Sequence, residues 1–177
     1  MKNLVLVDCK KMNSFKNLKS LDGRNFILTI LLFIATVVSG YSQNSRLMDV
    51  NDFLKKSNTE VTKLQGYLTN LNPSVYLVNE VITKKTEKSS CLYTDVKSVK
   101  SINTIGLDTK SIEFVSIKIN SKNEIVSPID LSFFSQFPNL KYIVLEFEFE
   151  VSQSEAQKSI SKASENQSVL YKVEIQS

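Results

Sequence analysis

Residues 139–151, NLKYIVLEFEFEV, carry the pattern that most restricts the fold of this chain. Side chains along a β-strand point alternately to opposite faces. One face of this segment would hold Ile143, Leu145, Phe147, Phe149 and Val151. The other would hold Tyr142, Val144, Glu146, Glu148 and Glu150. A strand with one apolar and one largely acidic face predicts a sheet that is buried on one side and open on the other.

Two further segments alternate in the same way, residues 111–120 (SIEFVSIKIN) and 168–176 (SVLYKVEIQ). Between the three segments, residues 127–137 indicate a short helix and residues 152–166 a mostly solvated one that opens with Ser152-x-x-Glu155. The C-terminal order is therefore β-α-β-α-β, which favours parallel strands joined by right-handed crossovers. Strands covered on both faces would be almost continuously apolar, so we expect helices on one face only. The expected class is α+β, or α/β and repeat-like.

The region before these strands begins with helical signals. After a short helix around residues 50–56, Ser57 and Glu60 have the spacing of a capping box. Apolar residues then recur at helical spacing, which predicts a helix over residues 58–71 that ends before Asn72-Pro73. Residues 74–82 (SVYLVNEVI) predict a strand and residues 83–90 a polar loop. The pattern of residues 91–110 leaves helix and strand both open.

The N-terminal segment has the order of a secretory signal peptide. Basic residues precede the uncharged apolar run 26–38, and small residues follow it, which predicts cleavage between Ser42 and Gln43. Residues 1–42 are then the signal peptide. Residues 43–177 form one small globular domain, with a helical cap at 47–71 and a sheet-containing region at 74–177. Met12 would open a signal of more usual length, so translation from Met1 or from Met12 stays open.

An uncleaved leader is the alternative, with residues 26–41 as a permanent membrane anchor. The apolar run is shorter than the roughly 20 residues that a spanning helix requires. Cleavage therefore remains the prediction, and the product would be exported to a periplasmic or extracellular location.

The charge distribution argues against a nucleic-acid partner. The formal charge of +4 lies wholly within residues 1–42, because residues 43–177 hold 16 basic and 16 acidic side chains. Binding to a phosphate backbone requires a basic patch on the folded domain, and the mature chain has no net excess to supply one.

The composition also excludes several classes of catalytic and metal site. The chain contains no histidine, which removes the usual triads and the commonest zinc ligands. Only Cys91 would remain after cleavage, so no internal disulfide can form. No glycine-rich phosphate loop is present. Carboxylate pairs remain possible, but nothing marks Asp95 or Asp130 as part of one. We expect no cofactor and no enzymatic activity.

The polar face of the three C-terminal strands is the candidate binding surface. Its predicted residues are Ser116, Lys118, Glu146, Glu148, Lys172 and Glu174. One interpretation is a solvated face stabilised by opposite charges on neighbouring strands. A second is a surface that binds a partner. A third, a calcium site built from the glutamates, conflicts with the need for 6–8 converging oxygens, because alternate residues on a flat strand do not converge.

The same three segments carry a spaced aliphatic pattern. It places Ile112, Val115 and Ile117 in the first segment, Leu140, Ile143 and Leu145 in the second, and Leu170, Val173 and Ile175 in the third. Asn120 ends the first match, whereas Glu148 stands at that place in the second. This resembles the L-x-x-L-x-L-x-x-N pattern of leucine-rich repeats. The resemblance covers residues 112–177 and implies stacked units with a concave ligand-binding face and helix 58–71 as an N-terminal cap. A single α+β domain with a mixed sheet is the alternative.

These observations predict an exported, non-enzymatic binding protein whose partner is a protein or a component of the cell envelope. The alternative from a different class is a structural protein of the envelope, held in the membrane by residues 26–41. The sequence indicates neither the oligomeric state nor the identity of the partner.

Overall fold

The computed structural model describes residues 47–175 of the 177-residue chain. The expected signal segment 1–42, the Ser42–Gln43 junction, the anchor 26–41 and the two candidate start residues lie outside the described residues.

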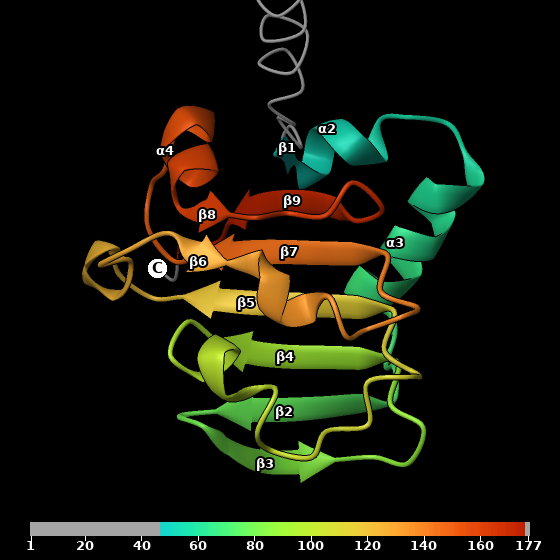
Figure 1. Ribbon diagram of the computed structural model, residues 1–177. Helices are drawn as coiled ribbons and strands as arrows, with labels where there is room; N and C mark the ends of the chain where they lie inside the picture. The colour runs from blue at the N-terminus through green and yellow to red at the C-terminus, as the bar shows by residue number, and fades with distance from the viewer. Residues whose placement is uncertain (1–46, 176–177) are drawn as a thin grey trace, which may run out of the picture. The chain divides into compact units, whose positions relative to one another are not determined.

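Seven strands form one mixed sheet with a few helices, which places the chain in the α+β or α/β class (Figure 1). The strands are β1 (Met48–Asp49), β2 (Ser74–Val78), β3 (Val81–Lys85), β4 (Cys91–Asp95), β5 (Phe114–Ile119), β7 (Tyr142–Phe147) and β9 (Ser168–Val173). Their order across the sheet is β1-β9-β7-β5-β4-β2-β3. All neighbours pair in parallel except β2 and β3, which are antiparallel. From β4 to β9, each long strand therefore lies beside the previous one.

The parallel strands begin at nearly the same level. The N–H of Cys91 donates to the carbonyl of Pro73, that of Phe114 to the carbonyl of Ser90, and that of Tyr142 to the carbonyl of Glu113. The donor–acceptor distance is 3.2 Å in each case. Because each strand starts from the same kind of lead-in bond, residues at equivalent positions form straight rows across the sheet.

The register agrees with the spacing of the first two aliphatic matches and differs from the third. Val115 pairs with Ile143, 28 residues later. Ile143 in turn pairs with Val169, 26 residues later, instead of with Val173. The third unit therefore begins four residues earlier than the aliphatic pattern around Leu170 suggests.

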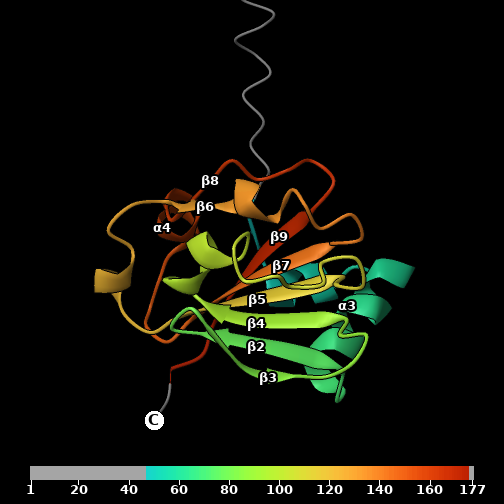
Figure 2. The same ribbon diagram turned by 60° about the horizontal axis from the view of Figure 1, so that its bottom comes forward.

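The connecting segments cover one face of the sheet (Figure 2). They contain the 3-10 turns η1 (Ser98–Ser101), η2 (Lys122–Glu124) and η3 (Leu131–Phe134), helix α4 (Gln153–Lys158) and the short parallel pair β6 (Ile129–Asp130) and β8 (Ile160–Ser161). A core of buried side chains fills the space beneath them, including Val115, Ile117, Ile119, Ile143 and Leu145. The predicted apolar face is therefore buried.

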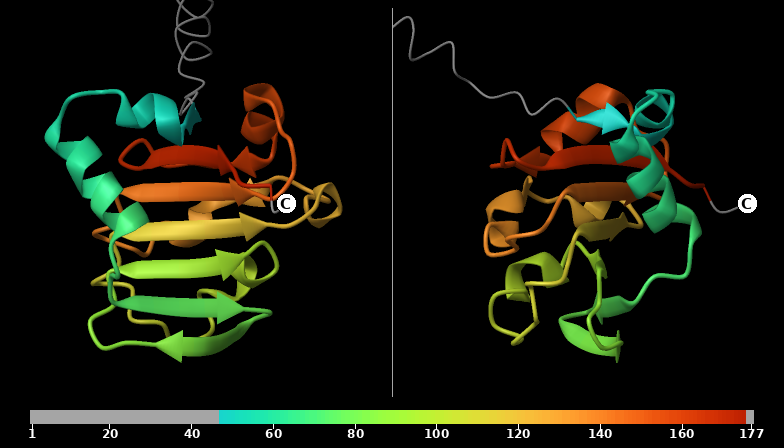
Figure 3. Two further views of the ribbon diagram at one scale, coloured as in Figure 1. Left: turned by 180° about the vertical axis from the view of Figure 1, so that it is seen from behind. Right: turned by 90° about the vertical axis from the view of Figure 1, so that its right-hand side faces the viewer.

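Helices α2 (Val50–Leu54) and α3 (Thr59–Thr69) cover part of the opposite face, near the amino ends of the strands (Figure 3). A second core lies there, with Phe53, Leu64, Phe114, Tyr142 and Val144 among its members. The expectation that only one face is covered is therefore wrong. The two helices that precede the sheet in the chain close part of the face that the strand pattern left open.

Helix α3 lies where the sequence predicts it, but its N-cap is Asn58 rather than Ser57. The Asn58 side chain accepts a hydrogen bond from the N–H of Val61 at 3.0 Å. The predicted N-cap, Ser57, is therefore wrong by one residue, and the helix does not begin with the expected Ser57–Glu60 capping box. Asparagine caps a helix as well as serine does. The second capping box is confirmed at α4, where Ser152 and Glu155 bond reciprocally.

Residues 74–90 contain a hairpin that the sequence analysis missed. Strand β2 ends at Val78, and Asn79 and Glu80 both have positive φ, 50° and 64°. A two-residue turn of this kind joins antiparallel strands tightly. Residues 81–85 then form β3, whereas the sequence pattern predicted one strand through Ile82 and a polar loop from Thr83. The ambiguous residues 91–110 begin as β4 and continue into η1.

The segments that connect β5 to β7 and β7 to β9 contain less α-helix than predicted. Residues 127–137 contain β6 and the 3-10 turn η3, and they form no α-helix. Residues 152–166 contain only the six-residue helix α4, followed by β8. The β-α-β-α-β order therefore holds for the second link and is wrong for the first.

Candidate functional site

Three rows of side chains cross the sheet on the face that meets α3. The first row, nearest the amino ends, holds Cys91, Phe114, Tyr142 and Ser168. The second holds Tyr76, Tyr93, Ser116, Val144 and Leu170. The third holds Asp95, Lys118, Glu146 and Lys172, and we call it the charged row. Charge therefore alternates in sign from strand to strand at the carboxyl ends.

The first row lies under α2 and α3 and is aromatic. The ring of Tyr67, on α3, stacks on Phe114 with centroids 5.5 Å apart. Phe53, on α2, meets the ring of Tyr142 edge-on at 6.3 Å. The Tyr142 hydroxyl donates to the Glu60 carbonyl at 3.1 Å, so its one polar group is satisfied. These contacts make Cys91, Phe114 and Tyr142 of the first row part of a packed core, so these three residues offer little surface to a partner.

The charged row remains accessible and is internally paired. The ammonium of Lys172 lies 3.0 Å from a Glu146 carboxylate oxygen and 2.7 Å from one of Glu174. That of Lys118 lies 2.6 Å from Glu148. The Lys172 and Glu146 side chains are each 20% exposed, whereas Lys118 is 47% exposed. The predicted charges thus come together in two groups of ion pairs.

Opposing effects act on the pKa of Lys172. Burial lowers it, but the hydrogen bond to Glu174 and the negative charges of Glu146 and Glu174 outweigh burial and raise it above its ordinary value. Lys172 is therefore held as a cation between two carboxylates, and this fixes its position at the end of the row.

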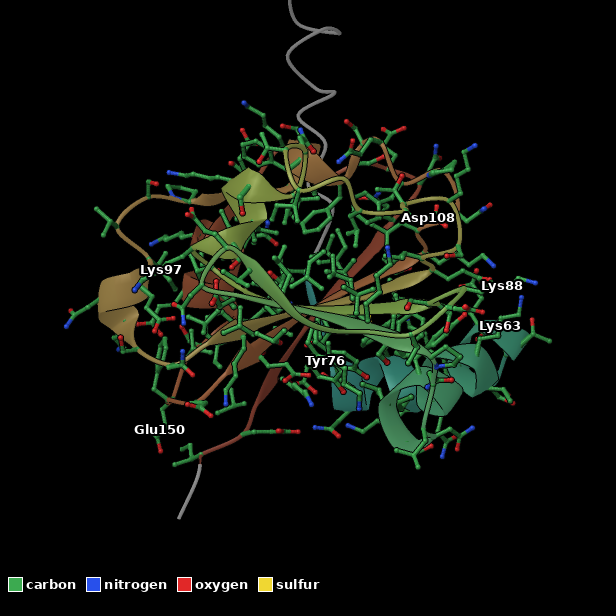
Figure 4. The ribbon with its side chains drawn as sticks, turned by 90° about the horizontal axis from the view of Figure 1, so that it is seen from below. Lys63, Tyr76, Lys88, Lys97, Asp108 and Glu150 are labelled. Carbon is green, nitrogen blue, oxygen red and sulfur yellow. The ribbon has the colours of Figure 1, made fainter. Side chains whose placement is uncertain are left out.

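Tyr76 and Tyr93 extend the accessible surface toward β3. Their rings stack with centroids 5.0 Å apart and an interplanar angle of 15°, and both side chains are half-buried. Figure 4 shows Tyr76 on the same side of the sheet as α3. Burial, with the nearby Cys91, Tyr76 and Glu146 groups, raises the pKa of Tyr93 to about 12. Sequence reasoning missed this pair. Tyr76 and Tyr93 meet only because β2 and β4 are neighbours in the sheet, and the sequence pattern did not predict the order of the strands.

Five of the six predicted binding residues reach the surface. Lys118 and Glu174 are exposed, and Glu146, Glu148 and Lys172 are half-buried. Ser116 is only 2% exposed, like its row neighbours Val144 and Leu170, which are buried in the second core, so its assignment to the open surface is wrong. We call the accessible residues Tyr76, Tyr93, Lys118, Glu146, Glu148, Lys172 and Glu174 the open patch.

Asp95 belongs to the charged row by register but has a structural task. Its carboxylate accepts the N–H of Asn79 at 2.7 Å and that of Ser98 at 2.8 Å. It thus ties the β2–β3 turn to the start of η1. Asp130 likewise accepts from Ser132 and pairs with Lys162 at 2.7 Å. These two acids do not converge on a common point in the described contacts.

Cys91 is fully buried in the first row. Burial raises the pKa of its thiol, and the hydrogen bond with Ser90 only partly opposes this. A buried, protonated thiol is a poor nucleophile. Within residues 47–175 there is also no group of three or more His, Cys, Asp or Glu side chains that could hold a metal ion.

Comparison of the chain with protein-family models, with curated proteins and with solved structures found no match. In the part of the chain that the structure describes, no helix has the length and apolar character needed to cross a membrane.

Proposed function

We propose that the chain is an exported, non-enzymatic binding protein that recognises a protein or an envelope component through the open patch. The observation that carries the proposal is the division of one sheet face, in which α2 and α3 cover the aromatic first row and leave the charged row and the Tyr76–Tyr93 pair accessible. A face left uncovered only at its polar end is suited to a polar partner.

The chemistry of the open patch supports a macromolecular partner. Tyrosine is enriched in protein interfaces because a rigid ring supplies contact area and its hydroxyl a hydrogen bond. The neighbouring ion pairs offer both signs of charge within a few residues. Such a pattern adds specificity and rate of association more than raw affinity. We propose an extended polar segment of the partner, lying across β4, β5, β7 and β9.

We also propose that the parallel strands and their links are irregular repeat units of the leucine-rich-repeat kind. In such an array the face opposite the links is the concave one that binds ligands, and the open patch lies on that side. The pairing of Val115 with Ile143 and of Ile117 with Leu145 supports this. The earlier start of the third unit at Val169 makes the array less regular than the sequence pattern suggests.

A charge swap within one ion pair tests the binding surface without removing the pair. In the native chain Lys118 and Glu148 lie 2.6 Å apart; the double substitution Lys118→Glu with Glu148→Lys keeps opposite charges at these two positions but reverses the local pattern. We expect it to abolish capture of envelope partners by the tagged full chain in its native type of cell. The matched control is Asp52→Lys with Lys55→Asp, which swaps an exposed pair on α2. Equal capture by wild type and both variants would refute the proposal.

The location is tested separately by fractionating cells that express the full chain and measuring its intact mass. Export with cleavage predicts a soluble species that begins at Gln43. A membrane-bound species that retains residues 26–41 would instead favour the alternative, a membrane-anchored structural protein of the envelope.

A further inference from the structure

A second concave site lies at the carboxyl ends of the strands, separate from the open patch. It is a cleft of about 790 Å³. Its walls come from the β2–β3 turn, the η1 region, the 124–130 segment, Phe133 and residues 161–162. This volume falls within the range of small-molecule sites, about 300–1,000 Å³. Ligands of parallel α/β sheets also bind outside the carboxyl ends of the strands.

The interior of the cleft is largely apolar. Val99 and Ile129 line it and are 2% and 5% exposed. Val96 and Phe133 are half-buried, and Val126 at the rim is 93% exposed. The exposed Val126 and the half-buried Val96 and Phe133 leave apolar surface for a ligand to cover, at a gain of about 25 cal/mol per Å².

Two lysines of the η1 region stand at this cleft. Lys97 and Lys100 both line it, and both are exposed. They are three residues apart at a 3-10 turn, where side chains at this spacing lie on the same side. Among the described residues neither lysine has a carboxylate within ion-pair distance. Figure 4 shows Lys97 at the end of the sheet away from Lys63 and Lys88.

Two of the acids that line the cleft are already engaged. Asp130 pairs with Lys162, and the hydrogen bonds from Lys162 and Ser132 hold its pKa at about 2. The carboxylate of Glu124 accepts the backbone and side-chain N–H groups of Asn120 at 3.1 and 3.0 Å. The third acid, Glu80, lies on the exposed β2–β3 turn. Its backbone N–H donates to the Ser98 hydroxyl at 2.8 Å.

We infer that this cleft binds a small amphipathic anion, with its apolar body on Val96, Val126 and Phe133 and its anionic group between Lys97 and Lys100. An anion there gives both lysines a partner of opposite charge. The inference is independent of the proposed function, because it uses no residue of the open patch.

Three eight-carbon probes test the inference with the protein as purified from its native type of cell: octanoate, octanol and octylammonium. Binding is measured by isothermal titration calorimetry. We expect saturable binding of octanoate at least tenfold tighter than that of the neutral and cationic probes. Equal binding of all three, or no binding of octanoate, would overturn the inference.

Two variants locate the site. Lys97→Gln with Lys100→Gln should weaken octanoate binding at least tenfold. The matched control, Lys84→Gln with Lys110→Gln, removes two exposed lysines from other segments and should leave it unchanged. Glu80→Gln should strengthen binding, because it removes a negative charge from the wall. Unaltered binding in the first variant, or weaker binding in the third, would contradict the assignment.

Discussion

The two ends of the sheet face beneath α3 differ in chemistry although the same strands build both. At the amino ends, Phe114 and Tyr142 are buried against rings from α2 and α3. At the carboxyl ends, four residues later on the same strands, Lys118 and Glu146 are partly exposed to water. Lys118 pairs with Glu148, and Glu146 pairs with Lys172. One face of a strand can therefore be core at one end and surface at the other.

This difference separates stability from recognition. Cys91, Phe114 and Tyr142 of the first row are buried, so a change there should act mainly on folding. The charged row is most accessible at Lys118, and exposed ion pairs contribute little to stability, so a change at that residue should act mainly on binding. Lys172 and Glu146 are each 20% exposed, so changes there should also act on folding. The following predictions test that separation, beginning with the largest effect.

The largest effect should come from the covered end. Phe114→Ala removes a ring that is 1% exposed and that stacks on Tyr67. We expect the free energy of unfolding to fall by about 3–5 kcal/mol, measured by urea denaturation. Val81→Ala, at a residue that is 61% exposed, is the control and should change it little. A loss below about 1 kcal/mol in Phe114→Ala would mean that α3 does not enclose the aromatic row in solution.

An intermediate effect should come from the most buried member of the charged row. Lys172→Met leaves the half-buried Glu146 without its cation, so we expect a loss of about 1.5–3 kcal/mol at pH 7. The pKa of Lys172 is raised in the folded state, so its contribution is fully present below the unfolded pKa of about 10.4. The contribution is lost as the pH rises through the folded value, and the difference between variant and wild type should shrink there. A difference that grows with pH would contradict the pairing.

A smaller effect is expected at the exposed end of the same row. Lys118→Met removes an ion pair in which the lysine is 47% exposed, so it should cost about 0–1 kcal/mol. Urea denaturation of Lys118→Met beside Lys172→Met makes the comparison. If Lys118→Met proved the more destabilising, the two ends of the charged row would have to be reassigned.

The last expected effect is a titration at high pH. Burial raises the pKa of Tyr67 to about 12, with the charge and hydrogen bond of Glu113 adding to it, and that of Tyr93 also to about 12. The native state keeps these phenolic protons after the unfolded chain has lost them, so stability should decrease between about pH 10 and pH 12. Absorbance at 295 nm should show late-titrating tyrosines in the folded protein, one fewer in Tyr93→Phe. Titration of all tyrosines near pH 10 would contradict the partial burial of both rings.

Part of this architecture was readable from local sequence. The alternation in residues 139–151 identified a strand with Ile143 and Leu145 toward the core, and both are fully buried. The helical spacing of Val61, Leu64 and Leu68 located α3, and the Ser152–Glu155 spacing located the cap of α4. Each of these features depends on residues close together in the chain, so local sequence patterns are sufficient to predict them.

The sequence by itself thus determined where the main strands lie, which of their faces is apolar, and that Lys118, Glu146, Glu148, Lys172 and Glu174 point away from that core. Only the tertiary structure decided which of those polar positions stay accessible. Ser116 and Lys118 share one face of β5, yet one is 2% exposed and the other meets water. The physical reason is that α2 and α3 pack across the amino ends of strands much later in the chain. The contacting rings of Tyr67 and Phe114 are 47 residues apart, and those of Phe53 and Tyr142 are 89 apart, so no local period records such contacts.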